Sequence, residues 1–194
     1  MEPTKTACPF DQWGIDIVGP FPLAHARKKF IIVAVEYFTK WVEEEAVAKI
    51  SEKEFINFIW KNIICRFGLP SVLISDNGTQ FHGRKITEWC KEIKIAQHFT
   101  AVVNPQANGQ IEVTNRTILQ HLKTRLENKG LWVDELPGVL WVYRTTPRTA
   151  TSETPFCLVY GTEAIIPTEI GEESQRVQRM TPKQTSTSEA STSQ

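Results

Sequence analysis

Residues 73–81 read LISDNGTQF, a short apolar run that ends abruptly in a polar turn. Its first residues suit a buried strand, whereas Asp76, Asn77 and Gly78 are typical turn formers. Ligands of open α/β sheets gather beyond the carboxyl ends of strands, so Asp76 stands where a functional carboxylate is expected. The same three residues also suit a turn without function, and this stretch alone does not decide between the two.

Three strand patterns precede this stretch. Residues 13–18 alternate until Gly19 and Pro20, residues 30–37 form a continuous apolar run, and residues 41–47 form a more polar third strand. The links between them are short enough for antiparallel neighbours. The continuous run suits a central strand that is buried on both faces.

A helix is predicted to begin at Ser51, which forms a capping-box pattern with Glu54 three residues later. Gly68 and Pro70 end it. Its apolar face is broad and consists of Phe55, Ile56, Ile59, Ile63 and Ile64. The strand at residues 72–75 is reached through this helix, so we expect it to run parallel to an earlier strand.

The remaining elements complete an α/β fold with a mixed five-stranded sheet flanked by helices. Three antiparallel strands come first, and two strands added by crossovers follow. The expected later elements are a helix over 86–93, a strand over 95–99, a loop rich in Pro, Gly and Asn, a long helix over 111–128, and a helical stretch from about 131 that is interrupted at Pro137-Gly138.

Composition sets limits on the class of protein. The chain has 194 residues, of which 41% are hydrophobic, which fits one domain with a core. Its 22 basic and 22 acidic residues cancel, so a contact with nucleic acid requires a local basic patch. The four cysteines form no C-x-x-C pair, so a structural zinc site is not expected, and we expect reduced, mostly buried thiols. No apolar stretch approaches the roughly 20 residues that cross a bilayer, so no membrane partner is expected.

Three acidic residues are candidates for one site. Asp16 lies inside the alternation of the first strand, where a carboxylate is costly to bury. If that strand lies beside the strand at 72–75, Asp16 is near Asp76, and Glu112 opens the long helix. Three converging carboxylates repel one another unless cations bind between them. An all-oxygen site suits Mg²⁺ or Mn²⁺, and two such ions about 3.5–4 Å apart would hold a phosphodiester.

Each acid also has an interpretation without function. Acidic residues fill 22 of 194 positions, so pairs at any given separation are common. Asp16 could lie in a strand irregularity, Asp76 in a simple turn, and Glu112 could interact with its helix dipole. The neighbouring residues have to decide.

Those neighbours resemble the integrase catalytic core of retroviruses and LTR retrotransposons, most closely the gypsy-type elements of plants. The resemblance covers about residues 9–170. The matching segments are WGIDIVGPFP (13–22), YFTKWVE (37–43), CRFGLP (65–70), ISDNGTQF (74–81), NPQANGQIEVTNRTI (104–118), RTTPRTATSETPF (144–156) and YGTEAIIP (160–167).

The resemblance implies a ribonuclease H-like fold and a two-metal polynucleotidyl transferase. The family signature has 35 residues between the second and third acids, as between Asp76 and Glu112 here. By resemblance, Asp16 bridges both ions, Asp76 holds one and Glu112 holds the other. Such enzymes trim the 3′ ends of the element's DNA with water and then use the freed 3′-hydroxyl to attack target DNA.

The resemblance also implies DNA contacts after the loop. Asn108 and Gln110 belong to a loop that is expected to close over DNA. Asn115 and Arg116 lie three and four residues after Glu112, hence on the same helical face. Lys123 lies further along that face, and it is equally well explained as a solvated surface lysine.

We expect three segments: an N-terminal remnant over 1–8, the integrase core over 9–170 and a disordered polar tail over 171–194. The amino-terminal zinc domain and the carboxy-terminal DNA-binding region of the family are not recognised, so we expect a fragment of a longer element protein. Dimerisation is expected through Ser51–Cys65 and Trp132–Tyr143. A nuclear location is expected from the resemblance only.

Two other functions stay open. The chain could be a catalytically silent module, derived from an element, that acts by binding DNA and dimerising. It could also be a true ribonuclease H, although the NPQANGQ loop and the 35-residue spacing disfavour that reading.

Overall fold

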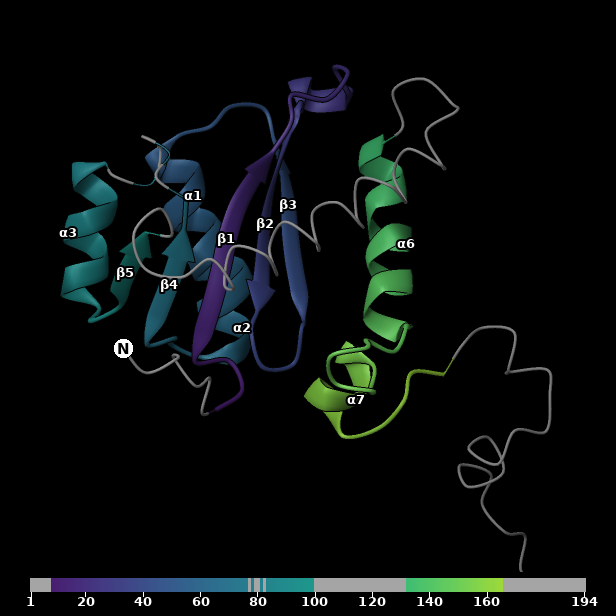
Figure 1. Cartoon of the computed structure of the whole chain (residues 1–194). Coiled ribbons are helices and arrows are strands. Elements are labelled where there is room, and N and C mark those ends of the chain that lie inside the picture. Colours follow the sequence, from purple (N-terminus) through teal and green to yellow (C-terminus); the bar gives the residue numbers. More distant parts are fainter. Residues whose placement is uncertain (1–7, 77, 79–80, 82, 100–131, 166–194) are drawn as a thin grey trace, which may run out of the picture.

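The five predicted strands form one mixed sheet in the order β3-β2-β1-β4-β5 (Figure 1). The structure is a computed structural model that describes residues 8–76, 78, 81, 83–99 and 132–165. The strands are β1 (Gln12–Val18), β2 (Phe30–Glu36), β3 (Val42–Val47), β4 (Val72–Ser75) and β5 (Ala96–Phe99). β1, β2 and β3 pair antiparallel, whereas β4 pairs parallel with both β1 and β5. The predicted fold class is confirmed.

β2 is buried on both faces, as its continuous apolar run predicted. Because side chains alternate along a strand, Ile32 and Ala34 join one core cluster while Ile31, Val33 and Val35 join another. The sheet therefore separates two hydrophobic layers.

A long interrupted helix follows the first three strands. Ser51 caps α1 (Glu52–Phe58), since its Oγ accepts a hydrogen bond from the Glu54 amide at 3.3 Å. The helix then widens into the π-helical segment η2 (Ile59–Ile64) before α2 (Cys65–Phe67). Gly68 ends it with φ 92°, a conformation that glycine adopts readily. The cap and the end are as predicted, whereas the π-helical segment is not.

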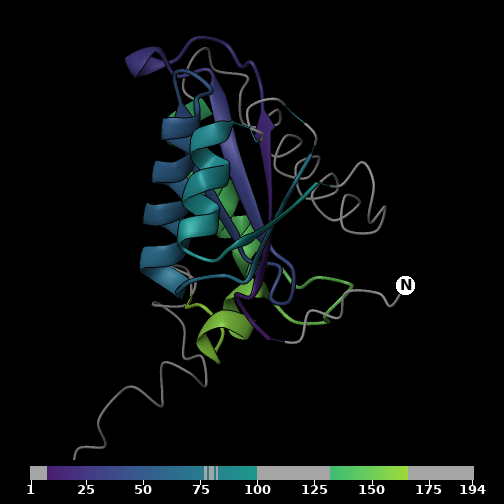
Figure 2. The same cartoon turned by 90° about the vertical axis from the view of Figure 1, so that its left-hand side faces the viewer.

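One hydrophobic layer lies between the sheet and the helices α1, η2 and α3 (Arg84–Glu92), which cover the same face (Figures 1 and 2). The buried helical residues of this layer are Phe55, Phe58, Ile59, Ile63, Ile86 and Cys90. Phe55, Ile59 and Ile63 belong to the predicted apolar face of the first helix, and the structure adds Phe58 to it.

The second layer lies beneath α6 (Trp132–Thr145), on the opposite face. The predicted interruption at Pro137-Gly138 is wrong, because α6 continues through both residues. The buried residues of this helix are Trp132, Leu136, Val139, Leu140 and Tyr143, and they recur at helical spacing on both sides of the proline. Packing of that face holds the helix together despite the missing Pro137 amide donor.

Arg144 ties α6 to β3, which is an edge strand. Its Nε and Nη2 donate to the Val42 carbonyl at 3.0 and 2.5 Å, and Nη2 lies 3.3 Å from Glu43. Arg66 of α2 donates to the same buried Glu43 at 2.6 Å, and the Arg144 guanidinium stacks over the Trp41 ring at 4.4 Å. A cation thus covers an edge carbonyl that would otherwise face solvent.

A short helix, α7 (Pro155–Tyr160), follows α6 and was not predicted. Thr154 caps it by accepting from the Cys157 amide at 2.9 Å, Pro155 occupies the first turn, and Gly161 follows its end with φ 73°. These are recognised start and stop signals, so the sequence did carry the information.

The expectation of mostly buried thiols is wrong: Cys90 is buried, Cys157 is partly buried, and Cys8 and Cys65 are exposed. All four are free. Within the described ranges, no helix is long and apolar enough to span a membrane. The predicted helix over 111–128 and the tail over 171–194 lie outside the described residues.

Candidate active site

Asp16 and Asp76 lie on neighbouring strands at the same end of the sheet. The parallel register pairs Ile15 of β1 with Ser75 of β4, so the two aspartates are the next residues in line. Neighbouring strands are about 4.8 Å apart. The predicted proximity of the two acids therefore follows from the observed register.

The two aspartates have different surroundings. Asp16 is half-buried, and its Oδ1 accepts from the Ile17 amide at 2.7 Å. Asp76 is exposed beyond the end of β4, and its Oδ1 accepts from the Gly78 amide at 2.9 Å. This second contact is the turn chemistry expected of an Asp-Asn-Gly sequence. The turn orients the carboxylate of Asp76 beyond the strand end.

The donor chemistry of this pair fits a hard divalent cation. Both side chains offer carboxylate oxygens, which Mg²⁺ and Mn²⁺ prefer. Asp76 is exposed, so its second oxygen can bind an ion while the first keeps its backbone bond. Two acids supply part of a metal site, and Mg²⁺ completes its six-fold coordination with further oxygen ligands.

The other predicted site residues lie outside the described residues. They are Glu112, the predicted third acid, and the predicted DNA contacts Asn108, Gln110, Asn115, Arg116 and Lys123. Their roles stay predictions.

A second group of possible ligands, which sequence reasoning missed, lies around α7. Ligand atoms of Glu153, Cys157 and Glu163 all lie within 4.8 Å of one another. Glu163 already accepts from the buried Thr154 hydroxyl at 2.8 Å. Burial and the two neighbouring carboxylates raise the pKa of the Cys157 thiol, so it keeps its proton and is a poor metal ligand. Glu153 and Glu163 are brought together only by the unpredicted helix between them.

The two predicted dimerisation segments expose only part of their aromatic side chains. In the second segment Trp132 and Tyr143 lie on the buried face of α6 and are not available to a second copy. Trp141 remains 39% exposed on the outer face of α6, and Trp60 on η2 is 53% exposed. Each segment thus presents one large aromatic side chain to solvent.

Comparison with protein families matches residues 6–105 to the integrase core domain. The chain is 32% identical over 169 residues to the Gag-Pol polyprotein of avian reticuloendotheliosis virus, covering 86% of this chain and 14% of that protein. It is 24% identical over 159 residues to the Pol polyprotein of the Drosophila melanogaster transposon 412, covering 81% of this chain and 13% of that protein. The chain therefore spans only a small part of the length of these relatives.

Solved structures share the fold. The HTLV-2 integrase catalytic core domain in complex with magnesium superposes in its trimeric form with a TM-score of 0.62 at 20% identity, over 77% of this chain and 96% of that one. Its dimeric form gives the same TM-score at 21% identity, over 78% and 97%. At this identity the likeness concerns the fold alone.

Proposed function

The chain belongs to the integrase core domain family, and from this premise we propose that it is the catalytic core of a retroelement integrase. It would trim the 3′ ends of the element's DNA and join them to target DNA. The observation that carries this proposal is the β1–β4 register, which puts Asp16 beside Asp76 at one end of the sheet. The 35-residue spacing to Glu112 supports it.

The proposed site is built from Asp16, Asp76 and Glu112. A pair of Mg²⁺ or Mn²⁺ ions, when bound, would activate the attacking oxygen and stabilise the leaving oxygen of the phosphodiester. Asp16 would contact both ions, Asp76 one and Glu112 the other. The magnesium in the HTLV-2 core supports this choice of metal.

The protein's own contribution is positioning. Hydrogen bonds between β1 and β4 fix the two backbones, and the Gly78 amide holds the Asp76 carboxylate in one orientation. Such a site binds the ions with little reorganisation, which suits a reaction that depends on geometry and charge. The proposed third carboxylate would complete the site from the following helix.

We also propose that the protein self-associates and acts on DNA in the nucleus. The dimeric and trimeric forms of the HTLV-2 core support self-association. The exposed Trp60 and Trp141 are the residues through which the two predicted segments would meet a second copy.

The decisive experiment measures DNA strand transfer, or its reversal on a branched oligonucleotide, with the 194-residue chain in Mg²⁺ and in Mn²⁺. Asp76→Asn should lower the rate at least about 100-fold, because removing a metal ligand removes several kcal/mol of transition-state stabilisation. Asp11→Asn, at the opposite end of β1, is the matched control and should keep full activity. Urea unfolding should show both variants folded.

Metal-dependent activity that persists in Asp76→Asn would overturn the assignment of the acids. A wild-type chain that binds DNA but never cuts or joins it would favour the silent binding module. Cleavage of an RNA–DNA hybrid in preference to DNA would favour a ribonuclease H.

A further inference from the structure

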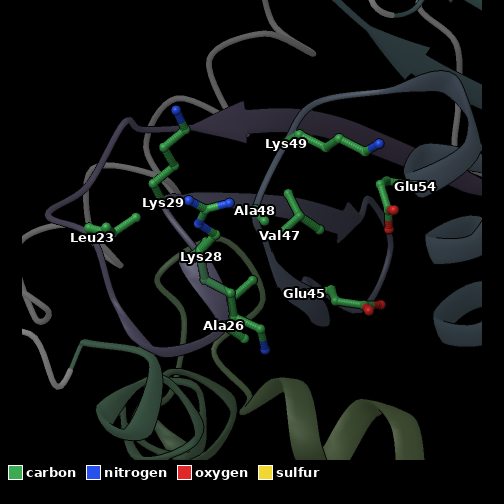
Figure 3. A pocket seen from close by; sticks show the side chains of 11 residues that line it. Leu23, Ala26, Lys28, Lys29, Glu45, Val47, Ala48, Lys49 and Glu54 are labelled. Atoms are coloured by element: carbon green, nitrogen blue, oxygen red, sulfur yellow. The ribbon is translucent and has the colours of Figure 1, made fainter.

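An open pocket of about 730 Å³ lies at the same end of the sheet as the two aspartates. It is formed by the loop between β1 and β2, the end of β3 with the residues that follow it, and the first turn of α1. Figure 3 shows Lys28 and Lys29 projecting from the loop and Lys49 from beyond β3, with Glu45 and Glu54 on the side away from Leu23. Arg27 also lines it. Four basic residues from two separate segments thus line one hollow.

A second hollow, of about 500 Å³, continues from the first. The two share Lys49 and Glu54, and the second adds Lys53 of α1 and Lys85 of α3. We call the six basic residues that line the two hollows the basic track; they are Arg27, Lys28, Lys29, Lys49, Lys53 and Lys85. The basic track runs from the β1–β2 loop to the start of α3, which is the helix that follows Asp76.

Two of the three acids in these hollows are already engaged elsewhere. Glu45 accepts from Asn62 at 2.8 Å and lies 3.9 Å from Lys61. Glu52 accepts from the Lys85 amide at 3.1 Å, so its carboxylate serves the first turn of α3. Glu54 remains. Among the residues that the structure describes, the salt bridges include no member of the basic track. Six cations of the track thus face three carboxylates, of which Glu45 also has Lys61 as a partner, so the two hollows keep a net positive charge.

The β1–β2 loop that carries three of these residues is held firmly. The Phe21 and Ala24 amides donate to the carbonyls of Lys29 and Lys28 at 2.7 and 3.0 Å. The Trp132 indole donates to the Pro22 carbonyl at 2.8 Å. The loop therefore presents its cations without first having to be ordered, which reduces the entropy lost on binding.

The strand register gives the distance between the pocket and Asp16. Asp16 lies opposite Val33 of β2, and Val47 of β3 lies opposite Phe30. Val47 lines the pocket. Relative to Asp16 it is displaced by three residues along the strand direction and by two strands across the sheet. At about 3.3 Å per residue and about 4.8 Å between strands, the separation is roughly 14 Å. That is the rise of about four base pairs of duplex DNA at about 3.4 Å each.

We propose that the basic track binds the phosphate backbone of duplex DNA a few base pairs away from the phosphate that reacts at Asp16 and Asp76. This inference rests on the proposed function. Lysines on four different segments make point-charge contacts to phosphates, which position a duplex without reading its sequence. The duplex would cross the end of the sheet, along the side covered by α1 and α3.

The test measures how the affinity of the 194-residue chain for a duplex varies with salt, in EDTA so that no chemistry occurs. Lys28→Gln combined with Lys49→Gln removes two track charges. Lys91→Gln combined with Lys94→Gln removes two exposed charges at the opposite end of α3 and is the matched control. The slope of log affinity against log salt should fall in magnitude by about 1.8 for the track pair, or about 0.9 per lost phosphate contact. The control pair should leave the slope unchanged, and two duplexes of unrelated sequence should behave alike.

An unchanged slope in the track pair, an equal fall in both pairs, or a wild-type chain that binds no duplex would each overturn the inference. Binding of inorganic phosphate is measured on the same variants. If the track pair loses phosphate binding while its duplex slope stays unchanged, the pocket binds free phosphate, and the inference is overturned. Duplex binding is measured in EDTA, whereas the catalytic proposal is tested by the strand-transfer activity of Asp76→Asn with metal present. Failure of the track is therefore distinguishable from failure of the catalytic proposal.

Discussion

Three consecutive glutamates on β3, Glu43, Glu44 and Glu45, have different surroundings because strand side chains alternate between faces. Glu43 is buried and accepts from Arg66 and from the Trp41 indole. Glu45 meets Lys61 and Asn62. Glu44 is largely buried and, among the residues that the structure describes, has no salt bridge of this kind. Burial raises its pKa to about 7, although Arg144 partly offsets the effect.

The raised pKa of Glu44 predicts a pH dependence of stability. The folded state holds this proton up to about pH 7, whereas an unfolded glutamate releases it near its ordinary value of 4.5. The contribution of Glu44 to the free energy of unfolding is complete below pH 4.5 and is lost as the pH rises through 7. The loss amounts to about 3 kcal/mol, at about 1.4 kcal/mol per pKa unit.

Urea unfolding between pH 5 and pH 8 measures this effect. Glu44→Gln should remove most of the fall in stability, because glutamine does not titrate. Glu88→Gln, on the exposed face of α3, should keep the wild-type profile. Identical profiles for wild type and Glu44→Gln would contradict the assigned burial.

At the residue scale, local signals in the sequence marked Asp16 and Asp76 as candidates, and their proximity was predicted on the condition that the two strands are neighbours. Alternation in β1 and the turn after β4 marked both acids, and the parallel crossover brought the strands together. The environment of Glu44 could not be predicted in this way. It depends on Arg144, which is distant in sequence and reaches β3 only because α6 packs there.

At the scale of elements, helix α6 shows where local rules fail. A proline inside a helix lacks the amide donor for the carbonyl four residues earlier, here that of Val133. The sequence therefore favoured an interruption at Pro137, whereas the structure has one continuous helix. The apolar face beneath α6 outweighs the local cost, and such tertiary stabilisation is invisible in a helix read alone.

Pro137→Ala should stabilise the protein by about 2 kcal/mol. Alanine restores a backbone hydrogen bond and removes a penalty of about 3 kcal/mol in a helix interior, less about 1 kcal/mol for the more flexible unfolded chain. Pro137 is exposed, so no core packing is lost. Thermal and urea unfolding measure the change.

Pro155→Ala is the contrasting variant. Pro155 occupies the first turn of α7, where an amide donor is not needed, so this change should give no stabilisation. Equal effects of the two substitutions would show that the position of the proline in its helix is not what matters.

At the scale of the whole molecule, one buried carboxylate joins the elements on both faces of the sheet. Glu43 on β3 meets Arg66 from α2 on one side and Arg144 from α6 on the other. The network lies at an edge of the sheet, where the two helical layers can reach the same strand. Breaking it leaves a buried charge with fewer partners.

Arg144→Met should therefore lower stability by about 3 kcal/mol, because loss of a partner leaves a buried acid incompletely neutralised. Arg84→Met, whose exposed side chain meets exposed Glu88, should cost less than about 0.5 kcal/mol. A double-mutant cycle of Arg144→Met with Glu43→Gln should show coupling of about 1 kcal/mol or more. Additive effects in that cycle would contradict a shared network.

The strand directions were predictable, because short links make antiparallel neighbours and helical crossovers make parallel ones. The neighbourhood of β1 and β4 was only a condition in the sequence argument, and the observed register establishes it. The place of α6 was not predictable, since either face of β2 is apolar and nothing local distinguishes them. Sequence patterns thus specified how the strands run but not the complete strand order or which helix covers which side.

The basic track also bears on how fast the protein and DNA meet. The chain as a whole is neutral, so the fields of its cations and anions cancel at a distance. Dissolved salt also screens each charge beyond about 8 Å at physiological ionic strength. Long-range steering of the encounter is then weak, and the association rate is close to that of an uncharged protein. Added salt would act chiefly on residence time, by weakening contacts that form only after arrival.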